Sequence, residues 1–354
     1  MSKTLVAVAM SGGVDSSLTA ALLKEAGYQV IGISMQMQPD EGNGRASRPT
    51  CGSPRDLGDA GRVCQVLGLP FHVVDVRSQF ETCVVDYFCT EYARGRTPNP
   101  CVVCNRQIKF DLLLRHALSL GAEYLATGHY ARIERRGQAC SLLRGADPSC
   151  DQSYFLYRLG ETELQRLLFP VGQYTKAEVR RMAAERGLPV AGKPKSQDLC
   201  FVPEGRYHDF VAQRVSVGPG EVVDEEGRVV GRHRGIPFYT VGQRTGLGVA
   251  SGERLYVLAI DAPNNRLVVG PKERLKVSRL RARDVSFVGD KPRQPVAVEA
   301  KIRYSSPQAG ALLQPVSDGV EVQFDRPQRA VAPGQAVVFY QGDRVLGGGV
   351  IEAS

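Results

Sequence analysis

The stretch Ser11-Gly12-Gly13-Val14-Asp15-Ser16-Ser17 decides how the fold is interpreted. The apolar run at residues 5–9 before it is typical of a buried parallel strand, and residues 18–25 after it predict a helix. Glycines between a strand and a helix let an anion approach the backbone, and the first N–H groups of the helix point toward that anion. No lysine follows the glycines, which excludes the Walker pattern of kinases and GTPases. The sequence therefore predicts a phosphate site at the start of this helix.

Strands and helices alternate along residues 1–214, which predicts an α/β domain with a doubly wound parallel sheet. Ligands of such sheets bind beyond the carboxyl ends of the strands, so Met35 and Gly128, which end two expected strands, are candidates for an adenine pocket. Short strands separated by Pro and Gly follow, and they predict a small all-β domain at residues 215–274 and a β-barrel at residues 275–354.

The charge of the chain indicates a polyanionic partner. Its 354 residues carry a formal net charge of +8, and residues 272–303 hold ten Lys/Arg against four Asp/Glu. We expect Arg279, Arg281 and Arg283 to contact phosphates there, and Arg303 to be more sensitive than any one of them. No apolar run approaches the ~20 residues that span a bilayer, and no signal-peptide pattern is present, so we expect a cytoplasmic protein without a membrane partner.

One cysteine pair has the spacing of reactive or metal-binding thiols. Cys101 and Cys104 form a C-x-x-C directly after residues 97–100, where two prolines favour an extended loop. We therefore expect the next helix, residues 105–120, to begin at Cys104, where a helix N-terminus stabilises a thiolate and makes a nucleophile. The alternative interpretation is a structural zinc site, in which both cysteines would be ligands. A second pair of Cys or His ligands for the zinc ion is missing from the pattern.

Several motifs spread over the chain point to one family. They are residues 10–17, Thr97-Pro98-Asn99-Pro100 with Cys104-Asn105, Gly128-His129-Tyr130, Asp151-Gln152-Ser153-Tyr154, Ser196-Gln197-Asp198-Leu199-Cys200-Phe201, Gly242-Gln243-Arg244 and Arg303-Tyr304-Ser305. With these motifs in this order, the chain closely resembles the tRNA-specific 2-thiouridylases of the ATP pyrophosphatase superfamily. That family replaces the 2-oxygen of the wobble uridine, position 34 of tRNA, with sulfur. The resemblance implies a first domain of the adenine nucleotide alpha hydrolase-like fold.

The resemblance also implies roles for individual residues. Cys104 would be the nucleophile and Cys200 the bearer of a persulfide sulfur, supplied by a donor protein such as a cysteine desulfurase or a sulfur relay. ATP, with Mg²⁺ on its phosphates, would be bound by Ala9, Met10, Ser11, Gly12, Gly13, Val14, Asp15, Ser16, Met35 and Gly128. The target base would face Asn99, Pro100 and Cys101, and other parts of the tRNA would contact His129, Cys150, Asp151, Gln152, Tyr304 and Ser305.

Two positions depart from the pattern and leave the sulfur chemistry open. Cys101 stands where similar enzymes often have aspartate, and Cys150 stands where they tend to have a basic residue. One route uses persulfide chemistry on Cys104 and Cys200, and the other uses Cys101, Cys104 and Cys200 as three ligands of a [4Fe–4S] cluster. Two other functions are kept as alternatives: a synthetase that adenylates a small metabolite, and a module that binds ATP or RNA without catalysis.

Overall fold

The computed structural model describes residues 3–38, 52–194, 199–202, 205–249 and 254–353. These residues form two compact units. The first unit comprises residues 1–84, 101–202 and 343–345, and the second comprises residues 85–100, 203–342 and 346–354.

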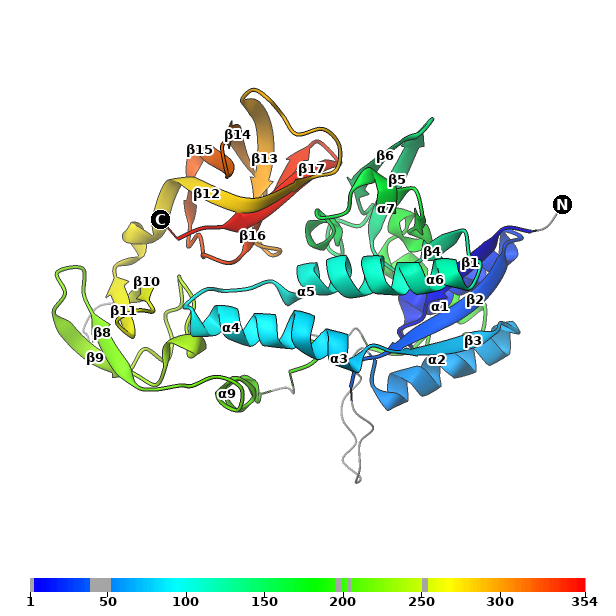
Figure 1. Cartoon of the computed structure of the whole chain (residues 1–354), viewed down its shortest axis with the longest axis horizontal. Coiled ribbons are helices and arrows are strands. Elements are labelled where there is room, and N and C mark those ends of the chain that lie inside the picture. The colour runs from blue at the N-terminus through cyan, green and yellow to red at the C-terminus, as the bar shows by residue number, and fades with distance from the viewer. Residues whose placement is uncertain (1–2, 39–51, 195–198, 203–204, 250–253, 354) are drawn as a thin grey trace. The chain divides into compact units, whose positions relative to one another are not determined.

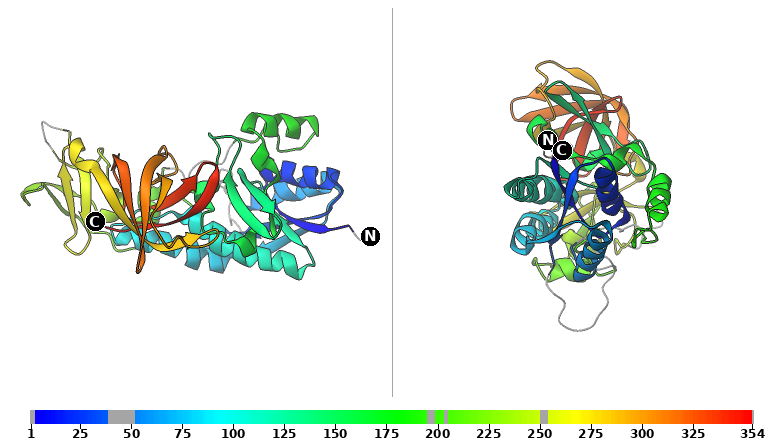
Figure 2. Two further views of the ribbon diagram at one scale, coloured as in Figure 1. Left: turned by 90° about the horizontal axis from the view of Figure 1, so that it is seen from above. Right: turned by 90° about the vertical axis from the view of Figure 1, so that its right-hand side faces the viewer.

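The first unit is built on a five-stranded parallel sheet with the strand order β3-β2-β1-β4-β7 (Figure 1). Its central strand β1 is buried because helices cover both faces of the sheet (Figure 2), which confirms the predicted doubly wound α/β fold. The strands are β1 (Leu5–Ala9), β2 (Gln29–Gln36), β3 (Phe71–Asp75), β4 (Tyr124–Ala126) and β7 (Leu167–Leu168).

Two helices of the first unit begin with a side-chain cap. Ser53 accepts a hydrogen bond from the N–H of Asp56 at the start of α2, and Thr175 forms a capping box with Glu178 at the start of α8. The helical segments are α1 (Val14–Glu25), α2 (Pro54–Leu67), α3 (Arg77–Phe80), π-helix η1 (Glu81–Asp86), α5 (Pro100–Val103), π-helix η2 (Cys104–Leu113), α6 (Leu114–Ser119), η3 (Ser153–Phe155), α7 (Glu161–Leu164), η4 (Pro170–Gln173) and α8 (Lys176–Glu185). An antiparallel hairpin is formed by β5 (Ala131–Arg136) and β6 (Ala139–Arg144).

One helix boundary was predicted wrongly. The helix that carries the cysteine pair begins at Pro100, one turn before Cys104. Proline is tolerated in the first turn of a helix because its missing N–H would have no partner there. The two prolines therefore limit the extended loop to the residues before Pro100 and do not prevent the helix that follows.

The second unit is mostly β structure. A four-stranded sheet has the order β10-β11-β8-β9, and pairing of β12 with β17 closes the six strands β12 to β17 into a barrel, as the sequence predicts. Its elements are α4 (Tyr87–Ala93), α9 (Tyr207–Ala212), β8 (Gly220–Val223), β9 (Val229–His233), η5 (Ile236–Phe238), β10 (Tyr256–Asp261), β11 (Arg266–Gly270), η6 (Lys272–Leu275), β12 (Lys276–Phe287), β13 (Val296–Lys301), β14 (Ala309–Val316), β15 (Gly319–Arg329), β16 (Ala336–Gln341) and β17 (Arg344–Ile351). Among the residues described, no helix combines the length and apolar character needed to cross a membrane.

Candidate functional site

The glycine turn between β1 and α1, residues 11–17, is called the phosphate loop below. Gly12 has a φ of +67°, and a Cβ added there would lie 2.3 Å from the main-chain oxygen of Asp56. The hydroxyl of Ser16 lies 3.2 Å from that of Ser11 and accepts a hydrogen bond from the N–H of Ser11. The turn is thus held by its own side chains, and the free N–H groups at the start of α1 are presented as a site for an anion.

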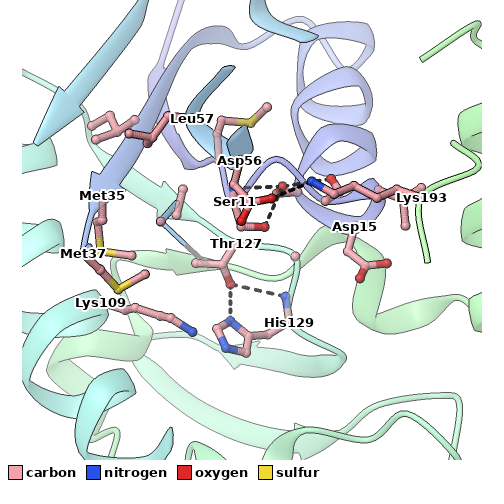
Figure 3. Close-up of a pocket in the computed structure, with 18 of the residues that line it drawn as sticks. Ser11, Asp15, Met35, Met37, Asp56, Leu57, Lys109, Thr127, His129 and Lys193 are labelled. Atoms are coloured by element: carbon pink, nitrogen blue, oxygen red, sulfur yellow. Dashed lines mark hydrogen bonds and ion pairs between the residues drawn. The ribbon is translucent and has the colours of Figure 1, made fainter. Parts of the chain in front are cut away.

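A cavity of about 280 Å³ opens beside the phosphate loop, at the carboxyl ends of β1, β2 and β4 (Figure 3). Its apolar wall is formed by Ile33, Met35, Met37 and Leu57, while the opposite side carries the phosphate loop and charged groups. An apolar slot that ends in an anion site suits a nucleotide. Of the predicted ATP ligands, the cavity is lined by Ala9, Met10, Ser11, Gly13, Val14, Asp15, Ser16, Met35 and Gly128, while Gly12 shapes the loop behind them.

Gly128 is the point at which β4 meets the phosphate loop. A Cβ on Gly128 would lie 2.7 Å from the N atom of Ser16 and 2.8 Å from the carbonyl carbon of Asp15. Both atoms belong to the backbone of α1, so neither can move aside as a flexible side chain could. The residue keeps the end of β4 in close contact with the helix N-terminus.

Replacing Gly128 with alanine is expected to weaken ATP binding at least about tenfold, because overpacking against backbone costs about 1–3 kcal/mol and displaces the loop that holds the phosphates. Titration calorimetry with ATP would measure the loss. Gly58→Ala is the matched control, because no atom lies within 4 Å of a Cβ at that exposed helical position. Equal ATP affinity in Gly128→Ala and wild type would contradict the role given to this contact.

Lys176 is held at the phosphate loop by Asp15. Its Nζ lies 2.6 Å and 2.7 Å from the two carboxylate oxygens of Asp15, and the hydroxyl of Tyr130 donates to the same carboxylate over 2.8 Å. Burial, and then the charge of Asp15, raise the pKa of Tyr130, so its hydroxyl keeps the proton that it donates. Lys176 and Asp15 both line the cavity, which places an ammonium group beside the anion site.

Lys193 forms a second anchored cation. Its Nζ lies 2.6 Å from Asp56 Oδ1 (Figure 3) and 2.7 Å from Asp59 Oδ2, and it donates to the main-chain oxygen of Gly12 over 3.0 Å. Burial alone would lower the pKa of Lys193, but the hydrogen bonds to Asp56 and Asp59 outweigh it and raise this pKa. Lys193 therefore stays charged and ties the phosphate loop to the first turn of α2.

His129 lies in the cavity wall as a neutral ring. Its Nδ1 is 2.7 Å from Thr127 Oγ1, and that hydroxyl also accepts a hydrogen bond from the main-chain N–H of His129. Burial, with the charge of Lys109 as a second cause, holds the pKa of His129 well below its usual value. The ring is thus neutral, and its hydrogen bond with Thr127 fixes its orientation in the cavity wall.

The three cysteines predicted for the chemistry all lie in the first unit. Cys104 is buried in the second turn of its helix, and Cys101 is exposed in the first turn, so the thiolate stabilisation that we expected at Cys104 from the helix terminus does not apply there. Cys200 is half-buried, and neither Cys104 nor Cys200 forms a disulfide with another described cysteine. Among the described residues, no three Cys, His, Asp or Glu side chains gather as a metal site, so the three cysteines do not form a ligand set in this arrangement.

The segment predicted to contact tRNA next to β6 has buried side chains. Cys150 packs into a core cluster with residues of α1 and α8, and the carboxylate of Asp151 accepts hydrogen bonds from the N–H groups of Gly145 and Ser153. Gln152 accepts from the N–H of Tyr130 and lines the cavity. These contacts give the segment a structural role, and its contact with tRNA stays a prediction.

The other expected tRNA residues belong to the second unit. Asn99 is half-buried and Pro100 is buried, while Tyr304 is half-buried and Ser305 is exposed. Arg303, next to that pair, donates from Nη2 to the carbonyl oxygens of Val241 and Ala330. This contact joins the barrel to the central β domain, and the greater sensitivity expected of Arg303 in tRNA binding stays a prediction.

The cavity residues that the sequence reasoning missed include the polar and charged side chains of Lys109, Thr127, Lys176 and Lys193. A triphosphate needs cations, and the absence of a lysine after the glycines was a signal to look for them elsewhere in the chain. Lys176 lies next to the capping-box Thr175, and Lys193 lies a few residues before Cys200. Their proximity to the phosphate loop arises only from the fold.

Three protein families match successive parts of the chain. The family described as tRNA methyl transferase HUP domain matches residues 4–204, tRNA methyl transferase PRC-barrel domain matches residues 208–271, and aminomethyltransferase beta-barrel domain matches residues 277–351. The tRNA-specific 2-thiouridylase MnmA of Heliobacterium modesticaldum is 51% identical over 99% of this chain and 92% of its own length. The chain belongs to the tRNA-specific 2-thiouridylase family.

Other members of the 2-thiouridylase family show the same extent of similarity. The MnmA protein of Pelotomaculum thermopropionicum is 49% identical over 100% of this chain and 99% of its own length. Among solved structures, a 4-thiouridine synthetase–RNA complex with bound ATP has a TM-score of 0.35 and is 18% identical to this chain. The match covers 60% of this chain and 50% of that one. The resemblance predicted from the sequence motifs is confirmed by the full-length relatives.

Proposed function

We propose that the protein catalyses the ATP-dependent 2-thiolation of the wobble uridine of tRNA, and that it releases AMP and pyrophosphate. The observation that carries this proposal is the cavity at the phosphate loop, whose apolar slot leads to a helix N-terminus flanked by anchored lysines. Full-length relatives that bear the name tRNA-specific 2-thiouridylase support the choice of reaction.

The residues of the cavity fit ATP. Met35 and its apolar neighbours would contact the adenine, while the phosphates would meet the N–H groups at the start of α1 and the ammonium groups of Lys176 and Lys193. Mg²⁺ would bind mainly to phosphate oxygens, as is usual for this ion. Asp15 is already paired with Lys176, so its first role is to orient that lysine.

The first chemical step makes the uridine oxygen a leaving group. The 2-oxygen attacks the α-phosphorus of ATP, the bond to the β-phosphate breaks, and pyrophosphate leaves. Lys176 and Lys193 stabilise the negative charge that develops on the pyrophosphate. His129 lines the same cavity, where its neutral ring offers a hydrogen bond to the substrate without adding a charge.

The second step brings sulfur to C2 of the uridine. The terminal sulfur of a persulfide on Cys200 attacks C2, and AMP leaves with the former 2-oxygen. Cys104 then attacks the inner sulfur of Cys200, which frees the 2-thiouridine and leaves a disulfide between the two cysteines. In a variant of this route, Cys104 cleaves the persulfide first and the released hydrosulfide attacks C2. The sulfur comes from a persulfide donor protein in either case.

The [4Fe–4S] alternative is not supported by the arrangement of the described cysteines. A cluster needs its three thiolates within a few ångströms of one another, and Cys101, Cys104 and Cys200 are not gathered in that way. The proposed mechanism therefore derives no step through iron.

The tRNA would be bound by the second unit as well as by the cavity. We propose that Asn99, Pro100 and Cys101 face the target base and that Tyr304 and Ser305 contact another part of the tRNA. The domain division at residues 1–214, 215–274 and 275–354 stays a proposal, and the cytoplasm is the compartment that we propose for the reaction.

Replacing Arg279, Arg281 and Arg283 together with glutamine is expected to weaken tRNA binding and to lower the slope of log K against log salt by about one to two. The expected change in slope is smaller than the loss of three full phosphate contacts would cause. The reason is that Arg281 is paired with Asp318 and Glu352, and Arg283 is paired with Glu352. Fluorescence titrations of labelled tRNA at several salt concentrations measure the slope. A triple glutamine variant of Arg77, Arg115 and Arg181, which are also exposed and acid-paired, is the control for net charge. Equal slopes in the two variants would mean that β12 presents only a solvated face.

The function is tested by deleting the gene and measuring 2-thiouridine in bulk tRNA by nucleoside mass spectrometry. Loss of the nucleoside, restored by the intact gene, is the expected result. In a purified system, pyrophosphate release should require tRNA. Release with a small metabolite and no RNA would favour the synthetase alternative, and binding of ATP and tRNA without release would favour the non-catalytic one.

A further inference from the structure

The turn that carries Cys200 is attached to the end of β2 by a side chain far away in sequence. The N–H of Val202 donates to the carbonyl oxygen of Leu199 over 3.2 Å, which closes a turn around Cys200. Gln38 Nε2 donates to the main-chain oxygen of Cys200 over 3.0 Å, across 162 positions of sequence. This bond fixes the backbone at Cys200 and is made to its main-chain oxygen, not to its thiol.

An aromatic contact holds the same turn from a second direction. The ring of Phe201 packs edge-on against Phe80, with 5.8 Å between ring centroids and 74° between ring planes. Phe80 ends α3 and is only 2% exposed, so it offers a fixed surface. Together the two contacts define both the position and the orientation of the turn.

Gln38 directly follows a residue of the cavity wall in the chain. It follows Met35 and Met37, which both line the cavity at the end of β2. The segment that shapes the apolar slot thus also provides the donor that holds the cysteine turn. A shift of Gln38 would change the distance between the bound nucleotide and Cys200.

We propose that Gln38, supported by Phe80, is a positioning residue for sulfur transfer, which holds the Cys200 turn at the edge of the nucleotide cavity. The inference rests on the proposed function, because it takes Cys200 as the bearer of the transferred sulfur. Holding two reacting groups at the correct distance and angle accounts for a large part of the rate of such a step. A misplacement of about 1 Å can lower that rate up to about a hundredfold. The adenylation step does not use Cys200 and is therefore independent of this contact.

The decisive variant is Gln38→Glu, which keeps the size of the side chain but replaces the N–H donor with a carboxylate oxygen facing a carbonyl. Under single-turnover conditions with ATP, tRNA and enzyme preloaded with persulfide, pyrophosphate release should stay within about twofold of wild type. Formation of 2-thiouridine should slow about tenfold. The ratio of pyrophosphate to 2-thiouridine rises accordingly, as water hydrolyses the waiting adenylated base. Gln38→Lys, which restores a donor, should return the ratio toward that of wild type.

A second readout does not depend on activity. The rate at which iodoacetamide alkylates Cys200, followed by mass spectrometry of its peptide, should increase in Gln38→Glu. Gln165→Glu is the matched control, because Gln165 Nε2 makes the same kind of bond, 3.0 Å to the main-chain oxygen of Gln138, within the same unit. That variant should leave both the ratio and the alkylation rate unchanged.

The outcomes separate the two proposals. A wild-type ratio in Gln38→Glu, or an equal fall in pyrophosphate release and thiolation, would overturn the positioning role. Wild-type enzyme that releases no pyrophosphate in the presence of tRNA would overturn the proposed function itself, whatever the Gln38 variants do.

Discussion

Replacing Cys200 with serine is expected to abolish tRNA thiolation, by roughly a thousandfold or more, while pyrophosphate release continues. A hydroxyl cannot carry a persulfide sulfur, but the adenylation step uses only the cavity at the phosphate loop. The measurement is a pair of assays on one sample, with radiolabelled pyrophosphate for the first step and nucleoside mass spectrometry for the second. Cys83→Ser, at another half-buried thiol, is the control and should behave as wild type.

A parallel variant, Cys101→Ala, decides between the two sulfur routes. If the persulfide route is correct, the Cys101→Ala variant should retain substantial tRNA thiolation activity, because Cys101 takes no part in forming or breaking a sulfur–sulfur bond. An inactive Cys101→Ala protein, together with stoichiometric iron and sulfide in anaerobically purified wild type, would require the cluster route instead.

Replacing Lys176 with methionine is expected to slow tRNA-dependent pyrophosphate release about a hundredfold or more, since one preorganised charge near a developing anion commonly contributes that much. Methionine keeps most of the side-chain volume, so the loss reports on the charge. Lys176→Arg should recover part of the rate, because a cation is restored beside Asp15.

Two control experiments distinguish the loss of the Lys176 charge from a general disturbance of the structure. Lys24→Met removes a lysine of α1 that donates to the carbonyl oxygen of Leu67, away from the cavity, and should leave the rate unchanged. Asp15→Asn with Lys176→Met should cost less than the sum of the two single variants, because each single change leaves its partner's charge uncompensated. Full activity of Lys176→Met at an unchanged melting temperature would remove Lys176 from the mechanism.

The parts of the site that come from local sequence could be predicted. The phosphate loop lies between a strand and a helix adjacent to it in the chain, and Met35 and Gly128 end parallel strands, so each lies at the cavity by a rule of sheet topology. The positions of Lys176 and Lys193 do not follow from sheet topology. They reach the loop through ion pairs with Asp15 and with Asp56 and Asp59, and pairing between distant side chains leaves no periodic pattern in a sequence.

The helix of the cysteine pair shows a different limit of prediction. The prolines before it correctly indicate an extended loop, but proline is compatible with both a loop and a first helical turn, so the pattern could not decide at Pro100. The buried side chains of Cys150 and Asp151 show a third limit, because a motif shared with a family identifies a segment without telling which of its atoms face a ligand.

The π-helix from Cys104 to Leu113 has a consequence for how this enzyme could change its length during evolution. In a π-helix the residue five positions along lies above the first, whereas in an α-helix four positions bring a residue back to the same face. Cys104 and the cavity residue Lys109 are five positions apart and so follow one another along one face. An α-helix that loses or gains one residue turns everything beyond that point by about 100°. Here, removal of one residue between Cys104 and Lys109, with return to α-helical geometry, would keep both on that face, so this helix can absorb a deletion that would rotate the face of an ordinary helix away from its ligand.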